Sequence, residues 1–175
     1  FVPEFWSEEW AVERLTELLG DAPVLRVEAR MFAVATRNTP PSRGERIETC
    51  VARAVRTALR EGDGDVLAFL PGVPEIRRTA TLLAGADLAD VDVLQLHGRL
   101  RPVEQDRALT PGPRRRVVLS TAVAESSLTV PGVRAVVDAG LARTPRIDHR
   151  RGLAGLVTVR VSAAVAEQRA GRAGR

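Results

Sequence analysis

Lysine is absent from this chain of 175 residues, since all 26 residues of the lysine and arginine class are arginine. A phosphate-binding loop of the Walker A type needs a lysine that reaches the β- and γ-phosphates of a nucleotide, so this chain cannot contain one. Any nucleotide chemistry in which the chain takes part therefore needs a phosphate loop from another segment or another polypeptide.

Cysteine, histidine and long apolar runs are also scarce. The single cysteine, Cys50, leaves no partner for an internal disulfide, which agrees with a reducing cytoplasm. The two histidines, His97 and His149, lie far apart without clustered cysteines or carboxylates. No apolar run approaches the roughly 20 residues that span a bilayer, and residues 1–4 show no secretory pattern. We therefore expect a cytoplasmic protein with no membrane partner and no metal site.

Charge is distributed unevenly along the chain. Residues 1–30 hold seven acidic and three basic side chains, whereas residues 143–175 hold two acidic side chains and eight arginines. Such asymmetry indicates an anionic partner, nucleic acid or nucleotide, at the C-terminal half. Aromatic residues make up only 3% of the chain, so stacking on bases is not expected to be the main contact.

Apolar runs bounded by glycine, proline and aspartate alternate with helical stretches from residue 65 onward. The runs are residues 66–70, 91–96, 117–119 and 133–137, and a one-faced helix is expected at 43–60. Runs of this length are typical of strands buried on both faces of a sheet. The sequence therefore predicts an α/β fold with a mainly parallel sheet.

Small or hydroxylated residues follow three of these predicted strands. Gly72 follows the first, His97 and Gly98 follow the second, and Thr121 follows the third. Each turn alone is an ordinary connection from a strand to a helix. Because the carboxyl ends of parallel strands meet at one edge, the three together favour a groove that contacts a nucleic-acid backbone.

The chain ends in the sequence QRAGRAGR, which continues an expected helix from residue 161. In an α-helix Gln168, Arg172 and Arg175 share one face and Arg169 points elsewhere, and such a row of donors suits a triphosphate. Gly171 and Gly174 are poor helix formers, which suggests that another surface approaches them closely. The alternative is a solvated basic helix.

Two long motifs carry a resemblance to a known family. QRAGRAGR matches motif VI of superfamily 2 helicases, and residues 120–129 resemble their motif V in its DEAH-box form. Residues 69–76 resemble motif IV. The chain looks most like the HrpB-type bacterial DEAH-box ATP-dependent RNA helicases, which implies a RecA-like three-layer fold with a projecting β-hairpin at residues 141–161. The implied division is a connecting segment at 1–40 and a second RecA-like lobe at 41–175, truncated at motif VI.

The resemblance also implies roles for single residues. Catalytic roles fall to the motif VI row, Gln168, Arg172 and Arg175. Contacts to the nucleotide fall to Ser127 and Thr129, and contacts to the nucleic-acid backbone to Gly72, Thr121, Arg146 and Arg150. Pro131 replaces the acidic residue that is commoner in the family, so a carboxylate contact to the ribose is not expected from it.

The resemblance implies half of an enzyme. The full-length protein would use ATP and Mg²⁺, neither bound tightly by this chain alone. Its partners would be the first RecA-like lobe of the same protein and RNA, with DNA as the alternative nucleic acid. The isolated chain is expected to be inactive, because it has no Walker A motif. The alternative from another class is a nucleic-acid-binding or partner-docking domain without enzymatic activity.

Overall fold

The computed structural model describes residues 15–20, 23, 32–84, 88, 90–126, 128–148 and 153–174. The chain divides into two units, residues 1–31 and 32–175. In the first unit, residues 15–18 form a helical turn. The predicted boundary between residues 40 and 41 stays a prediction.

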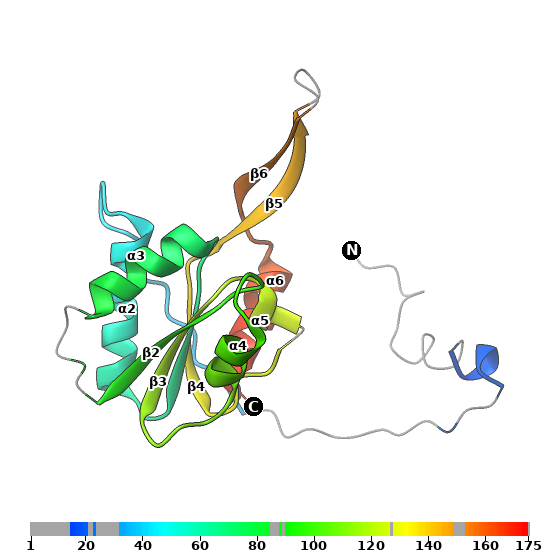
Figure 1. The fold of residues 1–175 in the computed structure, drawn as a ribbon, viewed down its shortest axis with the longest axis horizontal. Helices are drawn as coiled ribbons and strands as arrows, with labels where there is room; N and C mark the ends of the chain where they lie inside the picture. Colours follow the sequence, from blue (N-terminus) through cyan, green and yellow to red (C-terminus); the bar gives the residue numbers. More distant parts are fainter. Residues whose placement is uncertain are drawn as a thin grey trace. The chain divides into compact units, whose positions relative to one another are not determined.

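A four-stranded parallel sheet forms the centre of the second unit (Figure 1). Its strands, in the order in which they lie side by side, are β2 (Val91–Leu96), β3 (Arg115–Ser120), β1 (Asp65–Phe69) and β4 (Val133–Asp138). Every neighbouring pair is parallel, with Val66 opposite Val117 on one side and Ala135 on the other. The four strands predicted from the apolar runs are confirmed.

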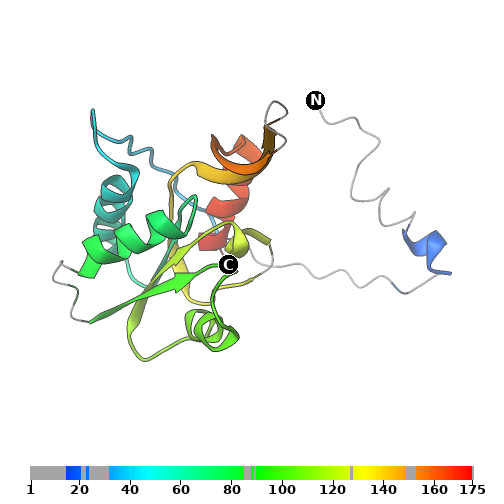
Figure 2. The same cartoon turned by 45° about the horizontal axis from the view of Figure 1, so that its top comes forward.

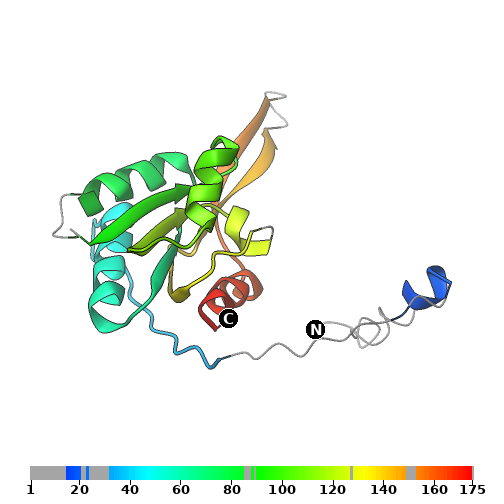
Figure 3. The ribbon, with the colours of Figure 1, turned by 60° about the horizontal axis from the view of Figure 1, so that its bottom comes forward.

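Helices cover both faces of the sheet, as Figure 3 shows. On one face Val66, Ala68 and Leu70 pack with α2 (Ile47–Glu61) and α3 (Val73–Ala84). On the other, Leu67 and Phe69 pack with α4 (Pro102–Leu109) and α5 (Val123–Ser126). Alternate residues of β1 thus enter two separate cores, which is why its sequence is continuously apolar. The predicted three-layer α/β architecture is confirmed.

The helix predicted at residues 43–60 begins later, at Ile47. Gly44 has a φ of 78°, which lies in the left-handed region and excludes a right-handed helical turn there. Ser42 and Glu45 close the turn, since the backbone N–H of Glu45 donates to the Ser42 carbonyl at 2.9 Å.

None of the described helices has the length and apolar content needed to cross a membrane.

The connections after β1 and β3 leave the sheet on opposite faces. The connection from β1 runs through α3, on the α2 side, to β2, whereas the connection from β3 runs through α5 to β4. A crevice between two such connections is where open α/β sheets bind ligands. Leu70 and Ser120 mark its floor, because the backbone N–H of Leu70 donates to the Ser120 carbonyl at 2.8 Å.

A buried ion pair closes the opposite end of the sheet. Arg116 is 2% exposed, and its Nε donates to Asp65 Oδ2 at 2.8 Å. Its Nη1 donates to the Thr110 carbonyl at 2.7 Å and its Nη2 to the Pro131 carbonyl at 2.6 Å. The pair therefore ties together β1, β3 and two loops, which leaves the carboxyl edge for ligands.

An antiparallel hairpin projects from the body of this unit, as Figures 1 and 2 show. It consists of β5 (Leu141–Asp148) and β6 (Leu153–Arg160), with Leu141 opposite Arg160. The predicted hairpin at residues 141–161 is confirmed.

The C-terminal helix is shorter than predicted. Helix α6 (Ala163–Ala170) is capped by Ser162, whose Oγ accepts the Val165 N–H at 3.3 Å, and a 3₁₀ turn, η2 (Gly171–Gly174), follows it. The continuous α-helix predicted through residue 175 is wrong beyond Ala170, because the low helix propensity of Gly171 lets the chain tighten into a 3₁₀ turn.

One of the two glycines in this turn meets another segment at close range. A Cβ on Gly174 would lie 2.7 Å from the backbone oxygen of Phe32, and the Phe32 N–H donates to the Gly174 carbonyl at 2.9 Å. The predicted close approach is confirmed at Gly174. It is wrong at Gly171, where a Cβ would meet nothing within 4 Å.

Candidate functional site

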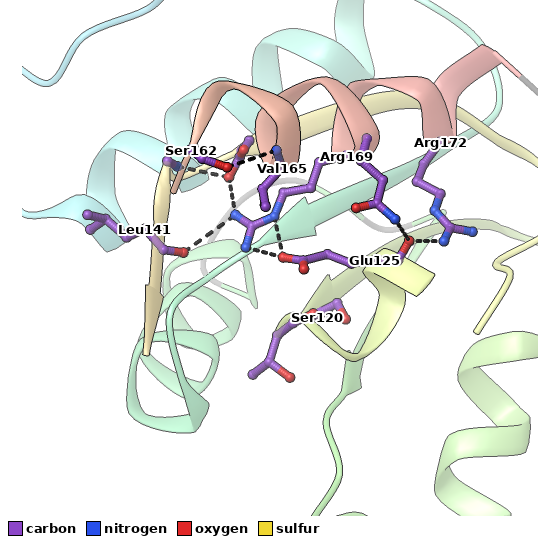
Figure 4. A network of polar contacts seen from close by, with 11 residues as sticks. Ser120, Glu125, Leu141, Ser162, Val165, Arg169 and Arg172 are labelled. Atoms are coloured by element: carbon purple, nitrogen blue, oxygen red, sulfur yellow. Dashed lines mark hydrogen bonds and ion pairs between the residues drawn. The ribbon is translucent and has the colours of Figure 1, made fainter. Parts of the chain in front are cut away.

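Glu125, in α5, joins the motif at residues 120–129 to the C-terminal motif (Figure 4). Its Oε1 accepts hydrogen bonds from Arg169, from Nε at 2.7 Å and from Nη2. Its backbone carbonyl accepts a second pair, from Gln168 Nε2 at 3.4 Å and from Arg172 Nη2. One residue of α5 therefore holds three side chains of α6 and η2.

Arg169 lies inside the protein, with only 1% of its surface exposed. Besides Glu125, its guanidinium donates to Asp138 Oδ1 at 2.7 Å and to the Leu141 carbonyl at 3.4 Å. Its Cζ lies 4.8 Å from the centroid of the Phe69 ring, within range of a cation–π contact. Arg169 does not turn away from Gln168 and Arg172 as the helical spacing predicts, because all three side chains contact Glu125, and the Arg169 side chain is part of the core.

Gln168 and Arg172 converge as the sequence predicts, because they donate to the same carbonyl oxygen. Gln168 is exposed, whereas Arg172 is buried at 9% exposure. The solvated basic helix that stood as the alternative is therefore wrong for Arg169 and Arg172. The two converging side chains offer N–H donors, which suit phosphate oxygens.

Gly72 lies beneath a guanidinium from the hairpin. It is buried, and a Cβ there would lie 2.8 Å from Cζ of Arg143 and 3.1 Å from Oε2 of Glu75. Arg143 Nη2 pairs with Glu75 Oε1 at 3.2 Å, while the Gly72 carbonyl accepts the Ile76 N–H at 3.0 Å. The guanidinium of Arg143, paired with Glu75, therefore covers this turn, and any contact of Gly72 with a ligand would have to pass that side chain.

The remaining predicted residues differ in accessibility. Thr121 is half-buried, and its N–H donates to the Leu96 carbonyl at 3.2 Å, so its hydroxyl is the group left for a ligand. Thr129 and Arg146 are exposed. Three predicted residues lie outside the part of the chain that the structure describes: Ser127, Arg150 and Arg175.

A basic groove of about 900 Å³ lies beside β2, on the α3 side of Gly72. Val73 and Pro74 line its near end, and Arg77, Arg99 and Arg107 contribute cationic side chains. His97 lies within it and is 5% exposed, and its Nδ1 accepts the Arg99 N–H at 3.3 Å. Burial lowers the pKa of His97 below its ordinary value, and the charge of Arg77 lowers it further. The groove therefore combines an imidazole with several guanidiniums and the carboxylate of Glu104, and the excess of guanidiniums suits anions.

Sequence reasoning missed three residues of this site: Glu125, Asp138 and Arg143. Glu125 carries a weak signal, since it is the single acidic residue among the small and hydroxylated residues 120–129. Asp138 follows an apolar strand and Arg143 is one arginine among many, so nothing local distinguishes them. Among the described residues, no group of three His, Cys, Asp or Glu side chains is arranged to hold a metal ion.

Comparisons with known proteins agree on one family. Residues 48–175 match the helicase conserved C-terminal domain. The ATP-dependent RNA helicase HrpB of Escherichia coli is 45% identical over 165 residues, which are 93% of this chain and 20% of that protein. The probable ATP-dependent RNA helicase DHR2 of Saccharomyces cerevisiae is 36% identical over 173 residues, 93% of this chain and 24% of that protein.

A solved structure extends the likeness to three dimensions. The crystal structure of the E. coli DExH-box NTPase HrpB matches with a TM-score of 0.81 and 45% identity, over 93% of this chain and 20% of that one. The chain therefore spans about a fifth of the length of HrpB.

Proposed function

This chain belongs to the family of helicase conserved C-terminal domains and is of the HrpB type, and we propose that it forms the second RecA-like lobe of an ATP-dependent RNA helicase. The whole enzyme would hydrolyse ATP between two lobes and translocate on RNA. Since the chain contains no lysine, the first lobe would supply the phosphate loop, together with the acids that hold Mg²⁺.

The chain's own part in hydrolysis would be carried by Gln168, Arg172 and Arg175. ATP supplies a terminal phosphoryl group whose transfer to water spreads negative charge over its oxygens. Arg172 would stabilise that charge with a guanidinium that never loses its proton, and Gln168 would donate a neutral hydrogen bond beside it. Thr129, which is exposed, and Ser127 would lie on the nucleotide side of the same cleft.

The nucleic-acid surface would follow the carboxyl edge of the sheet. Arg143, above Gly72, and the Thr121 hydroxyl lie at the connections where the crevice opens, and Arg146 is exposed on the hairpin. The basic groove with Arg77 and Arg99 extends this surface along β2. Guanidiniums and hydroxyls contact phosphate and sugar without reading the bases, so recognition of RNA would be largely independent of sequence.

The observation that carries the proposal is the convergence of Gln168 and Arg172 on the Glu125 carbonyl. A basic surface helix would spread its polar side chains into solvent, whereas here two N–H donors from successive turns are gathered at one point. The amide of Gln168 and the guanidinium of Arg172 therefore lie close enough together to reach one anionic group.

The test is RNA-stimulated ATP turnover by the full-length protein with Arg172→Ala, at saturating ATP and RNA. Loss of an arginine that stabilises a transferred phosphoryl group typically lowers turnover by about 10³- to 10⁵-fold, with a much smaller effect on ATP affinity. Arg43→Ala is the matched control, because Arg43 is exposed in the loop before α2. Wild-type turnover by the Arg172 variant would refute the assignment, and no turnover by the wild type would favour the non-enzymatic alternative.

A further inference from the structure

The position of Arg172 depends on a second, buried arginine. Arg169 contacts four elements at once: it pairs with Glu125 of α5 and Asp138 of β4, donates to the carbonyl of Leu141 at the start of β5, and lies over Phe69 of β1. Because Arg169 is only 1% exposed, water cannot replace the protein groups that its guanidinium contacts. It therefore fixes α6, and the turn that follows it, relative to the sheet.

Helix α5 cannot fix its own position. It contains four residues, Val123–Ser126, and a single turn is not stable by itself in water. Ala124 packs this turn into the core, and the Glu125 side chain, which is 18% exposed, ties it to α6 by accepting two hydrogen bonds from Arg169. Carbonyls in the last turn of a helix have no partner within the helix, so the Glu125 carbonyl is available to Gln168 and Arg172.

The side-chain carboxylate and the backbone carbonyl of Glu125 therefore link Arg169 to Arg172. The carboxylate is held by Arg169 and the carbonyl by Arg172, as Figure 4 shows. Gln168 donates to the same carbonyl. We propose that Glu125 is a positioning residue for hydrolysis, which sets the direction of the Arg172 guanidinium through its backbone carbonyl. This inference rests on the proposed function of Arg172.

The charges around Arg169 also support a positioning role for Glu125. The carboxylates of Glu125 and Asp138 both pair with the one guanidinium of Arg169, which leaves a net negative charge beside the chain turn that carries Arg172. Asp138 is itself fixed, because its Oδ1 accepts the Gly140 N–H at 2.8 Å. Glu125→Gln removes one charge and leaves the Arg169–Asp138 pair in place, so it loosens the α5 anchor selectively.

The experiment is a double-mutant cycle in the full-length protein, with Glu125→Gln, Arg172→Ala and the double variant. Turnover, the KM for ATP and the folded fraction are measured for each. Glu125→Gln is expected to lower turnover per folded molecule by about 10- to 100-fold, because small misplacements of a catalytic group cost that much. A residue that acts through Arg172 has no further effect once Arg172 is alanine.

Glu45→Gln is the matched control. The carboxylate of Glu45 likewise accepts two N–H groups of one arginine, Arg53 Nε at 3.2 Å and Nη2 at 3.0 Å, but it lies beside α2. It is expected to leave turnover unchanged.

Several outcomes would overturn the inference. Wild-type turnover by Glu125→Gln would do so, and so would effects of Glu125→Gln and Arg172→Ala that multiply in the double variant. If Glu125→Gln does not fold, Glu125→Asp takes its place in the cycle, since it keeps the charge but shortens the anchor, and the same criteria apply. Wild-type turnover by Arg172→Ala alone would instead refute the proposed function on which this inference rests.

Discussion

Nε of Arg169 lies 2.7 Å from Oε1 of Glu125, and the two residues are 44 positions apart in the sequence. The same guanidinium reaches Oδ1 of Asp138 at 2.7 Å on its other side. Truncating a buried partner leaves the remaining charges without compensation, which costs far more than the loss of a surface pair.

Arg169→Ala is therefore expected to destabilise the fold. The free energy of unfolding should fall by about 3–5 kcal/mol, because two largely buried carboxylates lose their partner. Urea denaturation followed by circular dichroism measures the change, with Arg43→Ala as an exposed reference. A loss no larger than that of the reference would mean that Arg169 is not buried as the structure places it.

Gly174→Ala and Gly171→Ala should act in opposite directions. A Cβ at position 174 would lie 2.7 Å from the Phe32 oxygen and 3.1 Å from Cγ2 of Val34, so the segments must separate, at a cost of about 1–3 kcal/mol. At position 171 the φ is −58° and the space is open, so alanine should be neutral or stabilise by up to about 1 kcal/mol. The unfolding temperatures of the two variants are compared with that of the wild type. Equal changes in both variants would contradict the close contact of Gly174 with Phe32.

The isolated chain should not hydrolyse ATP. The reason is the absence of lysine, and with it the phosphate loop, from all 175 residues. A purified sample is assayed with and without RNA. RNA-stimulated turnover by this chain, after exclusion of contaminating ATPases, would refute the division of the site between two lobes.

RNA binding by the second unit should be weak and should fall steeply with salt, because contacts to phosphates release counterions. Each arginine of the basic groove that neutralises a phosphate contributes about one unit to the slope of log K against log salt. Arg77→Ala and Arg99→Ala should each reduce that slope, whereas Arg43→Ala should not. Filter-binding titrations measure the slopes. Identical slopes for the wild type and the three variants would mean that RNA binds outside the basic groove.

His97 should make the folded state less stable in mild acid. Burial and the charge of Arg77 lower its pKa in the folded state, Arg99 acts in the same direction, and Glu104 opposes them. In the unfolded chain the pKa is about 6.5, so below that pH the unfolded state takes up the proton first. Stability from this group is therefore fully present above pH 6.5 and is lost as the pH falls towards the folded value.

The comparison that isolates this effect is His97→Gln. Denaturation curves at a series of pH values should show a smaller loss of stability below about pH 6.5 in the variant than in the wild type. A bound polyanion should raise the pKa of His97, which NMR titration of its ring carbons with and without RNA can follow. A pKa that RNA leaves unchanged would argue against occupancy of the groove.

The sequence by itself determined the fold class and pointed to the C-terminal motif as a candidate site. Continuous apolar runs such as residues 66–70 specify strands buried on both faces, and QRAGRAGR predicts a row of donors that would suit a phosphate. Both signals are local, because they depend on residues within a few positions of one another. The convergence of Gln168 and Arg172, four residues apart, could be predicted for that reason.

Only the tertiary structure decided which residues the side chains of the C-terminal motif contact. The partners of Arg169 are 44 and 31 positions away, and the guanidinium over Gly72 comes from Arg143, 71 residues further along the chain. No periodicity links positions so far apart, since their contact is set by how helices and hairpin pack on the sheet. The same holds at Gly174, where the approach of Phe32 fixes the last turn. Packing, and not local preference, thus made Arg169 part of the core and placed Arg172 against the carbonyl of Glu125.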